Sequence, residues 1–147
     1  PQKENTMEFS AAYQALNLRA VLTAAAVSYF FMALWYSPFV FGERWTKASH
    51  LTGRKLKKMN VYVLYGITFT MNLIAAFVLG MFLTAQPGLK HGAIAGFGAG
   101  FFWVGMFMFI IYTFERRPLP LYFIDGGYAA CAFTIMGAIL GGWNSFF

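Results

Sequence analysis

Four runs of predominantly apolar residues, separated by short polar segments, dominate this chain of 147 residues. The runs cover about 18–37, 61–85, 93–114 and 121–142. Each run is long enough to cross the hydrocarbon core of a bilayer as an α-helix, which takes about 20 residues. None shows the sustained period-2 alternation that a membrane β-barrel requires, and a helix satisfies its own backbone hydrogen bonds in lipid. The pattern therefore predicts an all-α fold, a polytopic bundle of four transmembrane helices.

The polar segments between the runs carry residues that begin or end helices. Pro38 disfavours helical backbone at the residue before it, and Asn60 is well placed to cap the second run. Pro87 ends the second run, and Pro118 separates the third run from the fourth. We therefore expect residues 18–147 to form one membrane domain. Residues 1–17 form a more polar N-terminal extension, for which an interfacial helix and a continuation of the first span both stay open.

The composition supports this class of protein. Hydrophobic residues make up 59% of the chain and charged residues 11%, against about 25% charged in a typical soluble domain. Most of the residues behind the net charge of +6 lie between the first two runs, which is typical of a membrane loop and not of a nucleic-acid-binding surface. We expect the lipid bilayer as a partner, anionic lipid at this basic first loop, and no nucleic acid.

Positive charges are divided unevenly between the two ends of the predicted bundle. Eight of the eleven Lys and Arg residues fall in the first and third loops. These are Arg44, Lys47, Arg54, Lys55, Lys57, Lys58, Arg116 and Arg117. Because Lys and Arg accumulate in cytoplasmic loops, the sequence predicts a multi-pass protein of the bacterial inner (cytoplasmic) membrane with both termini on the non-cytoplasmic side.

Aromatic residues gather near the same predicted boundary, where amphipathic rings prefer to lie. They are Trp35, Tyr36, Trp45, Tyr62, Tyr112 and Tyr122. The first loop also carries Phe39 and Phe41 among its charges. An amphipathic segment in the interface and a solvated basic loop are both consistent with this mixture.

Asp125 is the most informative ionisable residue, because it lies four residues inside the fourth run, where a charge is costly unless it is paired or hydrated. The expected partner is Arg116 or Arg117 across the preceding turn, or a basic residue of the first loop. Gly126 and Gly127 beside the carboxylate would let a ligand approach. A structural ion pair and a proton or cation site both stay open.

Two further polar features have a structural and a functional interpretation. The turn formed by Glu115, Arg116 and Arg117 would anchor the ends of two helices, or would hold an anionic headgroup. Asn72 lies near the middle of the second run, where it is expected to hydrogen-bond another helix. A position on a transport path is the alternative for Asn72.

Small residues four apart line one side of two predicted helices. Gly92, Gly96 and Gly100 lie in the third run, and Gly137 and Gly141 lie in the fourth. Such faces let two helix backbones approach closely in a membrane. The pattern predicts helix packing, against the fourth helix of the same chain or against another subunit.

The sequence shows no catalytic constellation and no metal site. Cys131 is the single cysteine, and His50 and His91 are isolated on loops that the topology places at opposite membrane faces. No glycine-rich phosphate loop, HExxH motif or nucleophile elbow is present. We therefore expect no cofactor and no enzymatic activity.

Two separated motifs resemble a known family. The first is Leu34-Trp35-Tyr36-Ser37-Pro38, followed by Phe41-Gly42 and Trp45, and the second is Glu115-Arg116-Arg117-Pro118, followed by Ile124-Asp125-Gly126-Gly127-Tyr128. Together they resemble a family of small bacterial and fungal membrane proteins catalogued as a domain of unknown function. The resemblance implies a small helical membrane protein over roughly 18–143 and implies no catalytic or binding residues.

These sequence features are consistent with two functions. The glycine faces and abundant aromatic residues favour a noncatalytic subunit that assembles with itself or with other membrane subunits. The alternative is a small transporter or channel for a proton, a cation or a small solute that uses Asp125 and Asn72.

Overall fold

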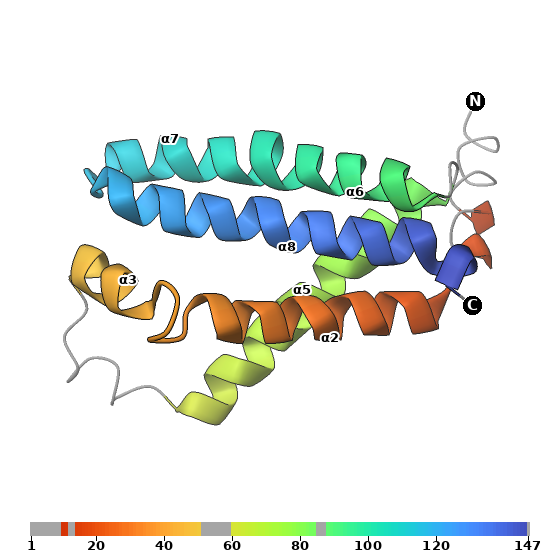
Figure 1. Ribbon diagram of the computed structural model, residues 1–147, viewed down its shortest axis with the longest axis horizontal. Coiled ribbons are helices and arrows are strands. Elements are labelled where there is room, and N and C mark those ends of the chain that lie inside the picture. The colour runs from red at the N-terminus through yellow and green to blue at the C-terminus, as the bar shows by residue number, and fades with distance from the viewer. Residues whose placement is uncertain (1–9, 12–13, 51–59, 85–87, 147) are drawn as a thin grey trace.

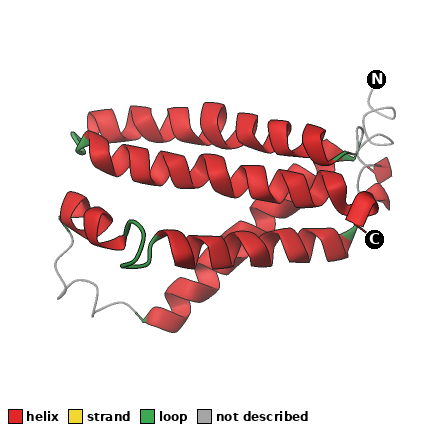
Figure 2. Cartoon of the chain, viewed as in Figure 1, coloured by secondary structure: helices red, strands yellow, loops and turns green. Residues whose placement is uncertain are grey.

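The computed structural model describes residues 10–11, 14–50, 60–84 and 88–146, and these parts of the chain contain helices and no strands. Four helical spans run alternately in opposite directions (Figure 1; Figure 2). They are α2 (Leu18–Trp35), α5 (Val61–Leu83), a third span composed of α6 (Leu89–Gly98), η1 (Ala99–Gly105) and α7 (Met106–Phe114), and α8 (Leu119–Phe146). Each span is long and apolar enough to cross a membrane, so the predicted fold class is confirmed and the chain is a multi-pass membrane protein.

The bundle has two ends that differ in structure. The end of α2, the short helix α3 (Gly42–Ser49) and the turn between α7 and α8 lie together at one end, here called the loop end. The start of α2, the start of α6 and the end of α8 lie at the opposite end, here called the terminal end (Figure 1). Most of the predicted N-terminal extension (residues 1–9 and 12–13) and the basic segment 51–59 lie outside the described residues.

Asparagine side chains begin two of the spans. The Asn17 side chain accepts hydrogen bonds from the backbone N–H groups at positions 19 and 20, at 3.0 and 3.3 Å. Asn60 caps α5 as predicted, by accepting from the N–H groups of Tyr62 and Val63 at 3.0 and 3.4 Å. Each cap satisfies amide donors that have no partner inside the helix, which matters most near lipid.

Helix α8 is the centre of the bundle, because it contacts α2, α3, α5 and every part of the third span. Figure 1 shows α8 between the third span and α2, with α5 crossing behind α2. A buried cluster of small and aliphatic side chains joins α2, α5 and α8. Its members are Val21, Ala24, Ala25, Ala76, Leu79, Leu83 and Met136. Together they form a dry core toward the terminal end.

The closest helix contact is between α6 and α8, and glycines make it possible. A Cβ atom added to Gly92 would collide with the carbonyl oxygen of Gly137, and one added to Gly96 would collide with the carbonyl oxygen of Phe133. The backbone N–H of Gly88 also donates to the carbonyl oxygen of Gly141 at 2.7 Å. The two backbones therefore touch, and no larger residue fits between them.

The third span is not the uninterrupted α-helix that the apolar run predicts. Between α6 and α7, the seven residues of η1 form a π-helix. π-helical segments inside α-helices change the direction in which later side chains point, and they are frequent at functional sites. Here the segment separates the half of the span that is packed through glycines from the half that leads to the loop end.

Helix α5 is packed along only part of its length. Its buried residues Ala76, Leu79, Gly80 and Leu83 all lie in its second half, whereas residues 61–67 are exposed. Figure 1 shows the first half tilting away from α2 toward the loop end. Since α5 packs on α2 and α8 and only slightly on α6, its first half and the third span do not close on each other.

Candidate functional site

Asp125 lies in the second turn of α8 and is 7% exposed. The Tyr36 hydroxyl donates to Asp125 Oδ1 at 2.7 Å, and the Tyr112 hydroxyl donates to Oδ2 at 2.7 Å. Tyr36 follows the last residue of α2 and Tyr112 belongs to α7, so the carboxylate links three spans. Short hydrogen bonds to a charged acceptor are among the stronger ones in proteins. The carboxylate is therefore held in place by two neutral donors.

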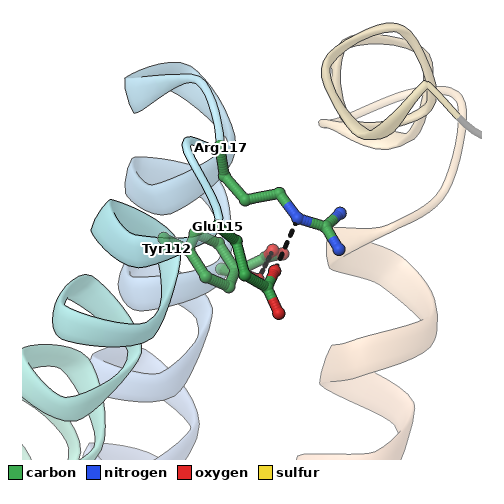
Figure 3. Close-up of polar contacts among 4 residues, drawn as sticks. Tyr112, Glu115 and Arg117 are labelled. Atoms are coloured by element: carbon green, nitrogen blue, oxygen red, sulfur yellow. Dashed lines mark hydrogen bonds and ion pairs between the residues drawn. The ribbon is translucent and has the colours of Figure 1, made fainter.

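The expectation that Arg116 or Arg117 pairs with Asp125 is wrong, and the alternative partners Arg54, Lys55, Lys57 and Lys58 of the first loop lie outside the described residues. Arg117 Nε donates to Glu115 Oε2 at 2.8 Å, and both side chains are almost half exposed (Figure 3). Arg116 turns the chain between α7 and α8 with a φ of 53°. The charged turn is thus a surface feature at the loop end, and nearness in sequence pointed to the wrong donors.

Tyr36 remains a hydrogen-bond donor over the whole physiological pH range. It lies just beyond the first membrane-spanning segment, and burial, followed by its hydrogen bond to Asp125, raises the pKa of the Tyr36 hydroxyl well above its ordinary value. A raised phenol pKa means that the neutral form is favoured. The phenol therefore donates to the carboxylate and does not compete with it for a cation.

Aromatic rings line the same cavity as the carboxylate. The Tyr36 ring lies edge-on to Trp45 of α3 at a centroid distance of 5.6 Å and lies 5.4 Å from the ring of Tyr128 of α8. Trp35 Nε1 donates to the backbone carbonyl of Ile124 at 3.1 Å, which ties the end of α2 to α8. The two sequence motifs that carried the family resemblance therefore meet at this site.

A groove of about 450 Å³ leads from Asp125 along α8. Its floor is α8 from Asp125 to Met136, and its walls are α5 on one side and η1 with α7 on the other. Trp45 lies at its loop end, and Asn72 projects into it from α5. The groove exists because the first half of α5 diverges from the third span. The structure thus brings Asp125 and Asn72, which are far apart in sequence, into one cavity.

Asn72 joins α5 to α2 and also lines the groove. The Ser28 hydroxyl donates to Asn72 Oδ1 at 3.2 Å, and Asn72 Nδ2 donates to the carbonyl of Thr68 one turn earlier at 3.0 Å. Ser28 is completely buried in α2. Asn72 therefore hydrogen-bonds another helix, as predicted, and also lines the groove.

The family described as "Protein of unknown function (DUF1761)" matches residues 19–141. The chain belongs to this family. No curated protein and no solved structure matches the chain. The DUF1761 match includes both sequence motifs and the whole groove, and it assigns no activity, so the function has to be argued from the site.

The remaining predicted residues of this DUF1761 protein lie elsewhere. Gly92, Gly96 and Gly100 pack on α8 and are not among the residues that line the groove, and Cys131 is exposed. His50 ends α3, far in the fold from His91 at the start of α6. In the described ranges, no three His, Cys, Asp or Glu residues lie close enough to hold a metal ion.

Sequence reasoning missed the roles of the tyrosines. The sequence places Tyr36 and Tyr112 at the membrane interface because they are aromatic and lie near span ends. The structure also has both residues near the ends of spans. Their hydroxyl groups point inward to Asp125 instead of toward the lipid headgroups. The sequence could have indicated this role, because a buried carboxylate needs hydrogen-bond donors and tyrosine hydroxyls at a similar depth in the membrane can supply them.

Proposed function

We propose that this protein is a carrier that binds a cation in the groove along α8 and moves it through the membrane, with Asp125 as the binding group. The observation that carries the proposal is the position of Asp125 and Asn72 in one groove between α5 and the third span. Among the described residues that line this groove, Asp125 alone carries a formal charge.

The chemistry of the carboxylate supports cation binding. A charge near the hydrocarbon core attracts a counter-charge strongly because solvent screening is weak there. Each carboxylate oxygen accepts one tyrosine hydroxyl and keeps further lone-pair directions free. A cation that enters the groove can therefore bind Asp125 while both tyrosines stay in place. Protonation of Asp125 removes the charge and with it the attraction, so exchange between a proton and a cation follows naturally.

The shape of the groove favours a carrier over an open channel. The groove reaches Met136, and there the dry core formed with Val21, Ala25 and Leu79 begins. This core separates the groove from the terminal end. A solute bound at Asp125 would cross only if the helices rearranged, as carriers do between their two states.

Flux measurements in proteoliposomes test the proposal. Liposomes with an acidic lumen would contain a trapped pH-sensitive dye, and sodium, potassium, tetraethylammonium or tetraphenylphosphonium chloride would be added outside. Exchange of an entering cation for a proton should raise the lumenal pH faster than in protein-free liposomes. If none of the cations raises the lumenal pH above that baseline, the carrier function is wrong.

Two variants separate the groove from the general surface charge. Asp125→Asn should reduce exchange to the level of protein-free liposomes, because it removes the charge and keeps the side-chain size. Glu115→Gln is the matched control, since Glu115 is an exposed acid at the same loop end that pairs with Arg117. This control should leave exchange unchanged.

The noncatalytic subunit stays a second candidate, and α5 is the observation that favours it. Residues 61–67 at the start of α5 are exposed, and Val63 and Tyr65 stay exposed among the described parts of the chain. Another subunit, or a second copy, would cover such a face in an assembly. In a Cys131→Ser background, Tyr65→Cys should then crosslink in native membranes, and Leu79→Cys, at a buried position in the packed half of α5, should not.

A further inference from the structure

We infer that the cation is a lipophilic organic cation, with an amine or quaternary onium group bound at Asp125 and an apolar body lying in the groove. This inference rests on the proposed function and names the class of its substrate. The observation that supports this inference is that the two ends of the groove differ in chemistry.

The loop end of the groove is suited to an onium group. Asp125 supplies a negative charge, and the rings of Tyr36, Trp45 and Tyr128 line the same end of the groove. The Tyr36 ring contacts the other two at centroid distances of 5.6 and 5.4 Å. Aromatic faces attract cations through their quadrupoles, and this is how proteins commonly recognise quaternary ammonium groups. A carboxylate with three rings binds such a group without needing a hydrogen-bond donor on it.

The same end is poorly suited to a metal ion. Hard cations such as calcium and magnesium need about six or more oxygen ligands. Asp125 is the one acidic side chain among the described groove residues, so the groove offers a metal ion one carboxylate and few other oxygen ligands. A metal ion would have to keep most of its water shell in a space bounded by apolar side chains.

The rest of the groove is suited to an apolar body. Beyond Asp125 the walls are mainly apolar, with Met71 on α5, Val104 and Met108 on the third span, and Met136 on α8. From Asp125 to Met136, α8 rises by about 16 Å. The volume of about 450 Å³ falls within the range of sites for drug-sized molecules. Methionine side chains are flexible and polarisable, so they adapt to apolar bodies of different shapes.

The position of the site also matches how an amphiphilic cation lies in a bilayer. Asp125 is about 9 Å along α8 from the helix start at Leu119, just inside the interface. The apolar part of the groove extends deeper, and Met71 on its wall is 57% exposed between α5 and the third span. An amphiphilic cation that enters from the bilayer has its charge near the surface and its apolar body in the hydrocarbon. The charged end and the apolar end of the groove follow the same order.

Equilibrium binding of two ions of nearly equal size and opposite charge tests the inference. The full chain, in nanodiscs of zwitterionic phosphatidylcholine, would be titrated with tetraphenylphosphonium and with tetraphenylborate, and empty nanodiscs would correct for partition into lipid. Tetraphenylphosphonium should bind saturably with one site per chain, and tetraphenylborate should not. Equal binding of the two ions, or no saturable binding of tetraphenylphosphonium to folded protein, overturns the inference.

Variants at the two ends of the groove give independent checks. Asp125→Asn should weaken tetraphenylphosphonium binding by about tenfold or more, and Glu115→Gln should not change it. Val104→Phe would fill the apolar part and should also weaken binding, whereas Val78→Phe, on an exposed face of α5 outside the groove, is its control. Equal affinity for the Val104→Phe and Val78→Phe variants, both shown to be folded by their unfolding temperatures, would contradict a body subsite in this groove.

The binding experiment and the flux experiment can contradict the two proposals independently. If sodium or potassium drives Asp125-dependent proton exchange and tetraphenylphosphonium does not bind, the carrier proposal stands and the substrate class is wrong. If tetraphenylphosphonium binds in an Asp125-dependent way and no cation drives exchange, the substrate class stands and the carrier proposal is wrong.

Discussion

The third span and α8 meet in two regions that are built in different ways. In the α6 half, Gly92 and Gly96 bring the two backbones into direct contact, and Gly100 of η1 extends this contact. In the α7 half, the span is held by side chains: Tyr112 donates to Asp125, and the rings of Phe109 and Tyr122 lie 4.7 Å apart. The π-helical segment η1 separates the two halves. The first contact cannot loosen without separating the backbones, whereas the second depends on a few side-chain contacts.

Helix α5 shows the same division. Its second half is buried in the dry core, and its first half diverges from the bundle. The groove wall on α5 lies where its exposed half meets its packed half, at Met71, Asn72 and Ala75, and the opposite wall is formed by Val104 of η1 and Met108 of α7. The floor of the groove and the terminal end of the bundle belong to the closely packed region. The proposed binding site thus lies at the boundary between closely and loosely packed regions, where local opening costs less free energy than in the closely packed core.

The largest expected effect concerns the closely packed half. Gly96→Leu should destabilise the protein by about 3 kcal/mol, because the new side chain would collide with the backbone of α8 at Phe133. Unfolding in detergent would measure the change. Gly98→Leu is the matched control in the same helix, since a Cβ atom there meets nothing within 4 Å. If both variants lose the same stability, α6 is not packed through its glycines.

An intermediate effect is expected at the carboxylate. Asp125→Asn and Tyr112→Phe should each destabilise the protein, and their combination should be non-additive by about 1 kcal/mol because the two side chains share a hydrogen bond. Asp125→Asn combined with Arg117→Gln should be additive, since Arg117 pairs with Glu115. Double-mutant cycles of unfolding free energy measure the coupling of Asp125 with Tyr112 and with Arg117. If Asp125→Asn is instead non-additive with Arg117→Gln and additive with Tyr112→Phe, Asp125 pairs with Arg117, as the sequence suggests.

The smallest expected effect is a local one. Tyr112→Phe should increase amide hydrogen exchange in α7 by severalfold and leave exchange in α6 unchanged, because it removes a contact of one half only. Mass spectrometry of peptides from Met106–Phe114 and from Leu89–Gly98 would compare the two halves. The exposed Thr113, whose hydroxyl bonds its own helix, provides the control Thr113→Val. Equal acceleration in both peptides would mean that the third span moves as one unit.

The sequence by itself determined the features that depend on neighbouring residues. Four helical spans follow from the length and apolarity of contiguous runs, and the cap at Asn60 follows from its place before the second run. The spacing of Gly92, Gly96 and Gly100 puts them on one helix face, whatever that face contacts. These properties are local, so no knowledge of the tertiary fold is needed to find them.

Only the tertiary structure decided which side chains meet. Tyr36 reaches Asp125 across 89 positions of sequence, while the nearby Arg116 and Arg117 remain at the surface. The groove and the π-helical segment are likewise absent from any local pattern. The physical reason is that these helices are apolar on nearly all sides, because lipid and protein interior are equally apolar surroundings. Without an amphipathic stripe to show which face turns inward, the rotation of each helix, and with it the partner of Asp125, is set by close packing between distant segments.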